Sequence, residues 1–178
     1  MSTYCDIAPG HPFHGPYHDH EYGFPIEDDN LLFGRLILEI NQAGLSWLTI
    51  LKKKEAFQDA FDRFDIERVA NYKNRDRERL LNNSGIIRNR LKIDAVIYNA
   101  QQILPLQDSH GSFLSWLDHH HPLPKENWVR LFKKNFKFTG GEITGEFLMS
   151  TGFLPGAHAE NCPVFERLGP LNPRWMDT

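Results

Sequence analysis

The residues of this sequence that could carry chemistry lie mainly near its two ends. Residues 17–22, YHDHEY, place four ionisable side chains between two tyrosines: His18, Asp19, His20 and Glu21. Adjacent side chains diverge on most backbones, so only one or two of them can contribute to any single site. Their partners must therefore come from elsewhere in the chain.

A metal site is one role for these histidines, because both cysteines of the chain lie near its ends. Cys5 precedes His18 by thirteen residues, and three residues separate His158 from Cys162. Together they make a Cys2His2 set, the composition of a closed tetrahedral zinc site. By spacing alone, three more histidines compete with His18: His11, His14 and His20. The alternative is two buried free thiols with histidines at the surface.

A metal bound by this set would have a structural role. Four protein ligands leave no open position for water, so the ion would stabilise the fold rather than catalyse a reaction. It would join two irregular segments, residues 1–27 and 153–178, that lack enough apolar residues to pack firmly. A disulfide is less favoured, because the chain starts without a signal-peptide pattern and we expect a cytoplasmic protein with reduced thiols.

A second group of chemically interesting residues lies in residues 38–55, LEINQAGLSWLTILKKKE. Glu39 belongs to an otherwise apolar helical segment, and the turn that follows leads to Trp47. An acid in such a place is commonly a solvated edge residue or a helix-cap contact. If it is buried beside Trp47 and Tyr17, its raised proton affinity or its acceptor oxygens could recognise a polar ligand.

Two further features bear on nucleic acid. In residues 82–93, NNSGIIRNRLKI, a glycine turn at Gly85 precedes a helix start whose backbone N–H groups could hold a phosphate, although a plain αα-hairpin has the same pattern. The net charge of −3 gives no global attraction to nucleic acid. Basic residues cluster locally, either as solvated helix faces or as one basic surface: Lys52–Lys54; Arg88, Arg90 and Lys92; and Lys133, Lys134 and Lys137.

The elements that must position these residues are predicted to be helices. With 178 residues, 40% of them hydrophobic, the chain suits a single domain with a real core, and no apolar run is long enough to span a membrane. The mean hydropathy is −0.48. No segment alternates strictly enough for a strand, so we expect an all-α fold whose helical body covers residues 28–152, with a hairpin near 80–93.

Capping residues set the expected helix boundaries. Asp28 or Asp29 begins a helix that ends at Gly44, and Ser46 begins the next. A long helix is expected from Arg88 to Pro105. Other expected caps are Asp65 and Asn74 at helix starts, and Asn135 and Gly152 in left-handed conformations at helix ends.

Several long motifs in a fixed order resemble the bacterial DNA-3-methyladenine glycosylase I family, within the helix-hairpin-helix glycosylase superfamily. They run from Cys5 to Cys162 and comprise YHDHEYG, QAGLSWLTILKKKE, SGIIRNRLKI, FKF at residues 136–138, and the final H-x3-C. Their combination is far more specific than any one of them.

The resemblance implies a role for individual residues. It implies a structural zinc bound by Cys5, His18, His158 and Cys162, which selects His18 over His20. It implies a base pocket of Tyr17, Glu39 and Trp47, with Tyr22 as a further wall. Gly44 and Leu45 match the wedge that fills the gap in the DNA stack. The hairpin with Gly85, Ile86 and Arg88 matches the element that grips the phosphate backbone.

The implied activity is hydrolysis of the N-glycosidic bond of 3-methyladenine in double-stranded DNA by a monomeric, monofunctional glycosylase. One alternative is a divergent relative that binds DNA or a modified base with weak or altered excision. Another is a zinc-dependent hydrolase unrelated to DNA. Some residues depart from the family pattern and are expected to thin the aromatic lining and add a carboxylate near the pocket: Ile7, His14, Tyr22, Gly141, Glu142 and Gly145.

Overall fold

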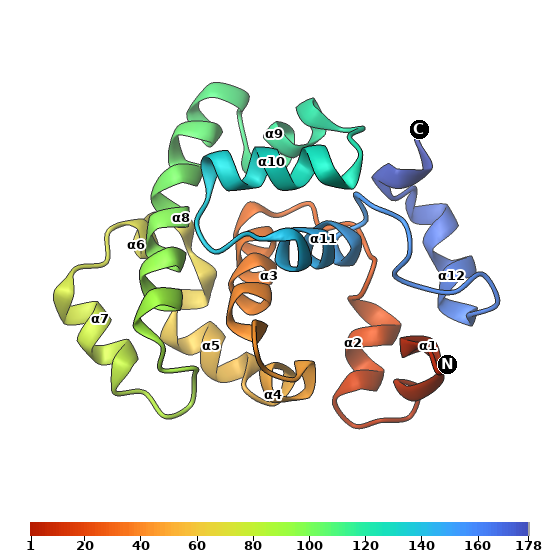
Figure 1. Cartoon of the computed structure of the whole chain (residues 1–178), viewed down its shortest axis with the longest axis horizontal. Coiled ribbons are helices and arrows are strands. Elements are labelled where there is room, and N and C mark those ends of the chain that lie inside the picture. The colour runs from red at the N-terminus through yellow and green to blue at the C-terminus, as the bar shows by residue number, and fades with distance from the viewer. Residues whose placement is uncertain (178) are drawn as a thin grey trace.

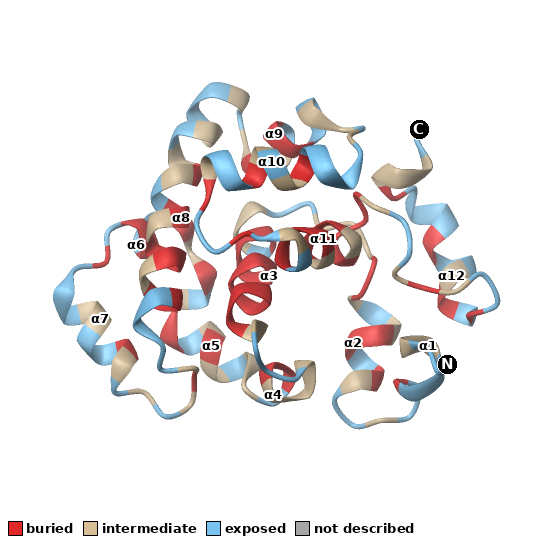
Figure 2. Ribbon diagram, in the orientation of Figure 1, coloured by how far each residue is buried: buried red, intermediate tan, exposed pale blue. Residues whose placement is uncertain are grey.

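The chain folds around one buried helix. The computed structural model describes residues 1–177, which form helices and loops without a β-strand, so the all-α prediction is confirmed (Figure 1). Helix α3 (Asp29–Gln42) begins after the cap Asp28, whose Oδ1 accepts a hydrogen bond from the Leu31 N–H at 2.9 Å. All ten of its residues from 32 to 41 are buried, which is typical of a helix at the centre of a core. In Figure 2 most of α3 is accordingly red.

The other helices surround α3 and bring the two chain ends together. In Figure 1 the N-terminal helices α1 and α2 lie beside the C-terminal helix α12, across the molecule from α7. Helices α4 and α11 contact α3 directly. The bounds are α1 (Tyr4–Ile7), α2 (His14–His20), α4 (Trp47–Lys52), α5 (Lys54–Ala60), η1 (Asp62–Phe64), α6 (Ile66–Ala70), α7 (Asn74–Leu81), α8 (Arg90–His110), α9 (Phe113–His120), α10 (Lys125–Asn135), α11 (Gly141–Ser150), α12 (Pro163–Leu168), η2 (Gly169–Leu171) and η3 (Arg174–Met176).

An aromatic cluster fixes the position of α11. Phe132 lies 5.3 Å from Phe136 and 5.7 Å from Phe147, measured between ring centroids, and Phe113 lies 6.4 Å from Phe147. Aromatic pairs at such separations each add about 0.5–1.5 kcal/mol beyond simple burial. Because these rings come from α9, α10, the residue after α10, and α11, they lock α11 against the helices around it, and α11 also contacts α3.

The predicted end of the long helix at Pro105 is wrong. Helix α8 continues through Pro105 to His110. The proline removes one backbone hydrogen bond, but Gln107 beyond it donates from Nε2 to Asp29 Oδ2 at 2.8 Å, and Leu104 packs against the core. These tertiary contacts outweigh the local cost of the proline. They also give Asp29 a role other than the helix cap, which is Asp28.

The predicted capping residues at helix starts are largely confirmed, with one correction. Ser46 and Asp65 cap α4 and α6 as expected, each accepting a hydrogen bond from a backbone N–H. Asn74 is instead the first residue of α7, and the cap is Lys73, whose N–H donates to Asp76 Oδ2 at 2.9 Å. The aspartate at the third position supplies what the capping residue lacks.

Of the two residues predicted to be left-handed at helix ends, Gly152 is confirmed and Asn135 is wrong. Gly152 has a φ of +82°, as predicted, but Asn135 is the last residue of α10 and donates from Nδ2 to the Leu131 carbonyl at 2.8 Å. The left-handed residue in this region is Phe138, with a φ of +61°. The long helix α8 starts at Arg90, two residues later than expected.

Lys92 contradicts the expectation of a solvated basic face. Its side chain is buried, and its Nζ donates to the carbonyl oxygens of Asn41 at 2.8 Å and Ala43 at 2.7 Å. These carbonyls lie at the C-terminal end of α3, where the helix dipole favours a cation. Lys92 therefore closes α3 and joins it to α8.

Replacing Lys92 with methionine is expected to lower the free energy of unfolding by about 1–3 kcal/mol, because the carbonyls of Asn41 and Ala43 lose a charged donor. Urea denaturation measures the loss. Arg90→Met on the same helix is the matched control, since Arg90 is exposed and should change stability by less than about 0.5 kcal/mol. Equal losses in the two variants would contradict this role.

Candidate active site and metal centre

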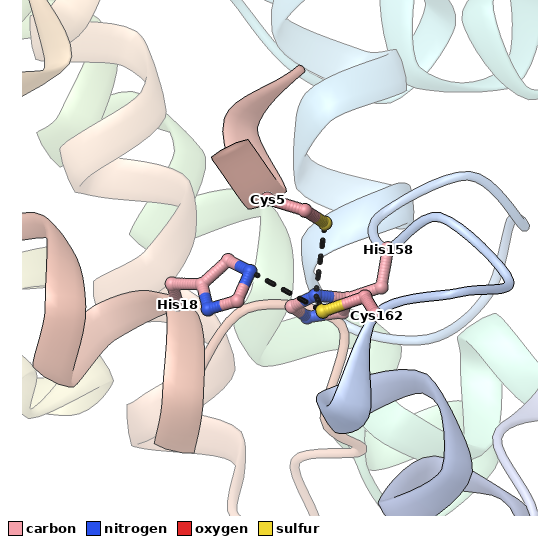
Figure 3. Close-up of side chains that lie close together, drawn as sticks. All are labelled: Cys5, His18, His158 and Cys162. Atoms are coloured by element: carbon pink, nitrogen blue, oxygen red, sulfur yellow. Dashed lines mark hydrogen bonds between the residues drawn. The ribbon is translucent and has the colours of Figure 1, made fainter. Parts of the chain in front are cut away.

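Two cysteines and two histidines meet where the chain ends come together. Cys5 comes from α1, His18 from α2, His158 from the loop after α11, and Cys162 from the residue before α12 (Figure 3). One ligand atom from each lies within 4.8 Å of all the others. The Cys162 sulfur lies 3.7 Å from both His18 Nε2 and His158 Nδ1, and Cys5 Sγ lies 3.7 Å from His158 Nδ1.

The geometry of this cluster fits a tetrahedral ion. Bonds of about 2.3 Å to sulfur and 2.0 Å to nitrogen would place those atoms about 3.5 Å apart. In each histidine, the ring nitrogen that does not face Cys162 has a contact that orients the ring. His18 Nδ1 lies 2.7 Å from Asp19 Oδ1, and His158 Nε2 lies 2.6 Å from the Tyr22 carbonyl. Such outer contacts are typical of metal-binding histidines. The cluster could bind a metal ion.

The histidines that competed by spacing lie outside the cluster. His14 Nδ1 lies 3.0 Å from the Tyr4 hydroxyl, and His11 Nδ1 accepts hydrogen bonds from the N–H groups of Phe13 and His14. His20 is exposed and lines a different cavity. Of the four alternatives, only His18 faces the cysteines.

A separate cavity of about 340 Å³ lies among α1, α2, α3, α4 and α11. It combines aromatic rings with acidic groups, which suits a flat, positively charged ligand. Its lining residues are Tyr4, Tyr17, Tyr22, Glu39, Gln42, Trp47, Glu142 and Glu146. All four residues that sequence reasoning assigned to a base pocket are therefore in one place.

The aromatic wall is continuous. The ring of Tyr17 lies 5.2 Å from Trp47 and 5.5 Å from Tyr22, and Tyr22 lies 5.3 Å from Tyr4, measured between centroids. Sequence reasoning missed Tyr4, whose position next to Cys5 was the only signal. Burial raises the pKa values of Tyr17 and Tyr22, which keeps both phenols neutral.

Glu39 is the most unusual residue of the cavity. Its side chain is 4% exposed, so it is no solvated edge residue, and it makes no hydrogen bond or ion pair with any residue in 1–177. Burial raises the pKa of Glu39 to about 8, against the lowering effect of Arg35 and with a further raising effect from Glu146. The indole N–H of Trp47 is also buried without a hydrogen-bond partner among these residues. Unsatisfied polar groups in one cavity indicate a ligand site.

Arg35 supports the cavity from behind and was also missed. It is buried one helical turn before Glu39 on α3, and its guanidinium carbon lies 5.0 Å from the centre of the Tyr17 ring. Nη1 donates to the Ser150 carbonyl at 3.1 Å, and Nη2 lies 3.4 Å from Glu21 Oε2. The i, i+4 spacing of an arginine and a glutamate on an apolar helix was the available sequence signal.

The expected thinning of the aromatic lining stays a prediction. Ile7 is 57% exposed and His14 contacts Tyr4, and neither lines the cavity. Tyr4 and Tyr22 keep that part of the wall aromatic. The expected additional carboxylate, Glu142, does line the cavity, together with the unpredicted Glu146.

The predicted wedge lies beside the cavity. Gly44 has a φ of +78°, which favours glycine, and Leu45 after it is 38% exposed. A second hollow is lined by Gly44 and the exposed Phe138 and shares Gln42 and Glu142 with the aromatic cavity. The turn between α3 and α4 thus presents an exposed apolar side chain close to the cavity.

The predicted hairpin joins α7 to α8. Asn83 Oδ1 accepts a hydrogen bond from the Gly85 N–H at 2.9 Å, and Lys53 Nζ donates to the Ser84 carbonyl at 3.2 Å. Arg88 is exposed, but the Ile86 side chain is buried in the core. Ile86 therefore anchors the hairpin, and its side chain is not available to DNA.

The aromatic, acidic cavity is of the kind in which a protein can hold a single base taken out of the nucleic-acid stack. A sequence profile of the methyladenine glycosylase family matches residues 8–130. The chain belongs to this family.

The similar proteins agree across nearly the whole chain. DNA-3-methyladenine glycosylase of Haemophilus influenzae is 32% identical over 92% of this chain and 98% of its own. DNA-3-methyladenine glycosylase 1 of Escherichia coli is 34% identical over 89% and 94%. A solved structure of 3-methyladenine DNA glycosylase I from Staphylococcus aureus, described for its recognition of 3-methyladenine, has a TM-score of 0.81 at 34% identity and covers 90% of this chain and 95% of that one.

Proposed function

We propose that this protein is a DNA glycosylase that hydrolyses the N-glycosidic bond of alkylated adenine, including 3-methyladenine, in base-excision repair. The observation that carries the proposal is Glu39, a buried acid that makes no hydrogen bond with residues 1–177 and lies in a cavity with aromatic walls. The family and its similar proteins support the same reaction.

The cavity suits a base that has left the duplex. Extrusion of a base costs a few kcal/mol, least when the base is damaged and poorly paired. A 3-methylated adenine in DNA is cationic, and the rings of Tyr17 and Trp47 attract a cation by about 0.5–2 kcal/mol each. Ionised Glu39 would accept a hydrogen bond from the exocyclic amine, strengthened by the opposite charges.

Little acid catalysis is then needed, because a cationic base is already a good leaving group. Water attacks the sugar as the bond to the base breaks, and the positive charge that develops on the sugar is stabilised by the adjacent phosphates. The described residues that line the cavity include no lysine, which supports a monofunctional enzyme that leaves an abasic site.

Double-stranded DNA is the proposed partner, bound by a monomer. Gly44 and Leu45 are proposed to fill the gap left by the base, since Leu45 is exposed beside the cavity. The hairpin around Gly85, with the exposed Arg88, is proposed to hold the backbone phosphates.

Among residues 1–177, no helix has the length and apolar character required to cross a membrane.

Zinc is the proposed occupant of the Cys2His2 cluster, because two thiolates and two imidazoles at tetrahedral spacing match its preference. The ion would fasten residues 1–27 to residues 153–178 within a single domain. With four protein ligands it has no open position, so its role is structural. We place the protein in the cytoplasm, where unpaired thiols such as Cys5 and Cys162 stay reduced.

The purified wild-type protein is expected to release 3-methyladenine from methylated duplex DNA and to leave abasic sites without strand cleavage. Chromatography of the released bases and cleavage of the product by alkali measure both events. DNA binding without release of any base would refute the enzymatic reading and favour a binding protein. Unmethylated duplex is the matched control.

A further inference from the structure

Arg35 is a buried charge that the proposed reaction leaves without a role. Its side chain is 6% exposed, and Arg35 and Glu39 are the two ionisable residues among the ten buried residues of α3. They lie one helical turn apart, at positions that are neighbours on a helix surface. Because a guanidinium keeps its proton in proteins, this charge must be balanced by contacts within the fold.

The contacts of Arg35 join three helices that line the aromatic cavity. Its Nη1 donates to the carbonyl of Ser150, the last residue of α11, and the same carbonyl accepts a hydrogen bond from the Gly23 N–H after α2. Its Nη2 lies 3.4 Å from Oε2 of Glu21, the residue that follows α2, and Oε1 of Glu21 pairs with Lys54 at the start of α5. Arg35 therefore ties α2 and α11 to α3.

The guanidinium also packs against the aromatic wall. Its carbon lies 5.0 Å from the centre of the Tyr17 ring, and such stacking holds a ring in one orientation. Tyr17 lines the aromatic cavity, whereas Arg35 lines a separate cavity of about 310 Å³ together with Glu21 and Lys54. The guanidinium therefore acts on a bound base through the Tyr17 ring and not by direct contact.

The charge of Arg35 acts on Glu39 as well. Burial raises the pKa of Glu39 and Glu146 adds to this, whereas Arg35 lowers it. Lys125 on α10 lowers the pKa of Glu146 instead. Among the described residues that line the cavity with Glu39, the other titratable groups are phenols and carboxyl groups, and none is a cation: Tyr4, Tyr17, Tyr22, Glu142 and Glu146. Arg35 is thus the positive charge that favours ionised Glu39.

We propose that Arg35 is a positioning residue of the reaction, which holds the Tyr17 ring and the walls formed by α2 and α11, and whose charge favours the Glu39 carboxylate that receives the cationic base. The proposal rests on the proposed glycosylase function and adds a residue that does not touch the base. Glu21 belongs to the same arrangement, because it fixes the guanidinium and offsets part of its charge.

The first test is the pH dependence of base release by Arg35→Met, which keeps a long side chain and removes the charge. The kcat/KM for release of 3-methyladenine from methylated duplex DNA should fall about tenfold at pH 7, and its rise should move from about pH 8 to higher pH, because Glu39 loses the opposite charge beside it. Arg35→Lys keeps a charge and should keep the rise near pH 8. Arg68→Met, at an exposed arginine on α6, is the matched control and should match the wild type at every pH.

The second test follows the ionisation of Glu39 without the reaction. In protein labelled with ¹³C at the glutamate carboxyl groups, the signal that is missing from Glu39→Gln belongs to Glu39, and NMR measures its titration. Arg35→Met should move this titration to higher pH. Glu21→Gln should move it to lower pH, because it removes an anion that offsets the charge of Arg35.

The outcomes separate this proposal from the proposed function. A loss of base release in Arg35→Met that is equal at every pH, or a Glu39 titration that neither variant moves, would reduce Arg35 to a structural role and overturn the proposal. Release of no base by the wild type would overturn the proposed function, and the role of Arg35 in the reaction with it. Thermal unfolding checks that Arg35→Met folds, and if it does not, the direction of the shift in Glu21→Gln decides.

Discussion

Replacing Cys162 with serine is expected to lower the free energy of unfolding by about 4 kcal/mol, the stabilisation that a ligand gives at a thousand times its dissociation constant. The reason is that Cys162 contacts both His18 and His158, and its loss opens the four-ligand set that joins the two ends of the chain. Chemical denaturation measures the loss, and elemental analysis should find about one zinc per wild-type chain and much less in the variant.

The matched control for this variant is His20→Ala. His20 is an exposed histidine two residues from His18 but lies outside the cluster, so zinc content and stability should stay at the wild-type level. A chelator should likewise lower the melting temperature of the wild type before it affects base release from the remaining folded protein. Loss of base release with unchanged folding stability would instead point to a catalytic metal and contradict the structural role.

Local sequence was a good guide where the side chain acts on its own backbone. Asp28, Ser46 and Asp65 begin helices as expected, because a cap needs only the N–H groups within three residues. Prediction failed where distant contacts decide. Helix α8 passes through Pro105 because Gln107 bonds to Asp29, a residue 78 positions away in the sequence.

The residues of the candidate site were likewise predicted where a sequence motif marks them and missed where packing brings them into the cavity. Long motifs identified Tyr17, Glu39 and Trp47, and the structure brings them into one cavity. Tyr4 and Glu146 were missed, because they enter the cavity only after the chain ends and α11 pack together. Lys92 was assigned to a basic cluster from its neighbours in the sequence. Its burial against the end of α3 was missed, because that burial depends on how α3 and α8 pack together.

Replacing Glu39 with glutamine is expected to lower the release of 3-methyladenine about 10- to 100-fold at neutral pH and above, the cost of losing a charged acceptor in a buried site. Trp47→Ala should weaken binding of the free base through loss of the ring. Glu67→Gln is the matched control on an exposed glutamate and should release bases at the wild-type rate. Unchanged release by both Glu39→Gln and Trp47→Ala would place the reaction elsewhere.

The pH dependence separates a role in the reaction from a role in folding. Burial raises the pKa of Glu39 from 4.5 to about 8, with Arg35 and Glu146 as the charged groups that act on it, so at neutral pH most free enzyme carries a proton there. Ionised Glu39 is the form that binds the cationic base. The kcat/KM of the wild type for base release should therefore rise as pH increases through about 8. Glu39→Gln should lose this rise.

The contribution of Glu39 to folding stability should fall as pH rises, whereas base release should increase. Because its pKa is higher in the folded state, Glu39 binds its proton more tightly there, and the stability it contributes is complete below about pH 4.5 and is lost as pH rises through about 8. Glutamine cannot ionise, so Glu39→Gln should be more stable than the wild type at pH 9 by urea denaturation while releasing less base. A variant that is both less stable and less active at that pH would show that Glu39 is needed for folding, and its assignment to the base would fail.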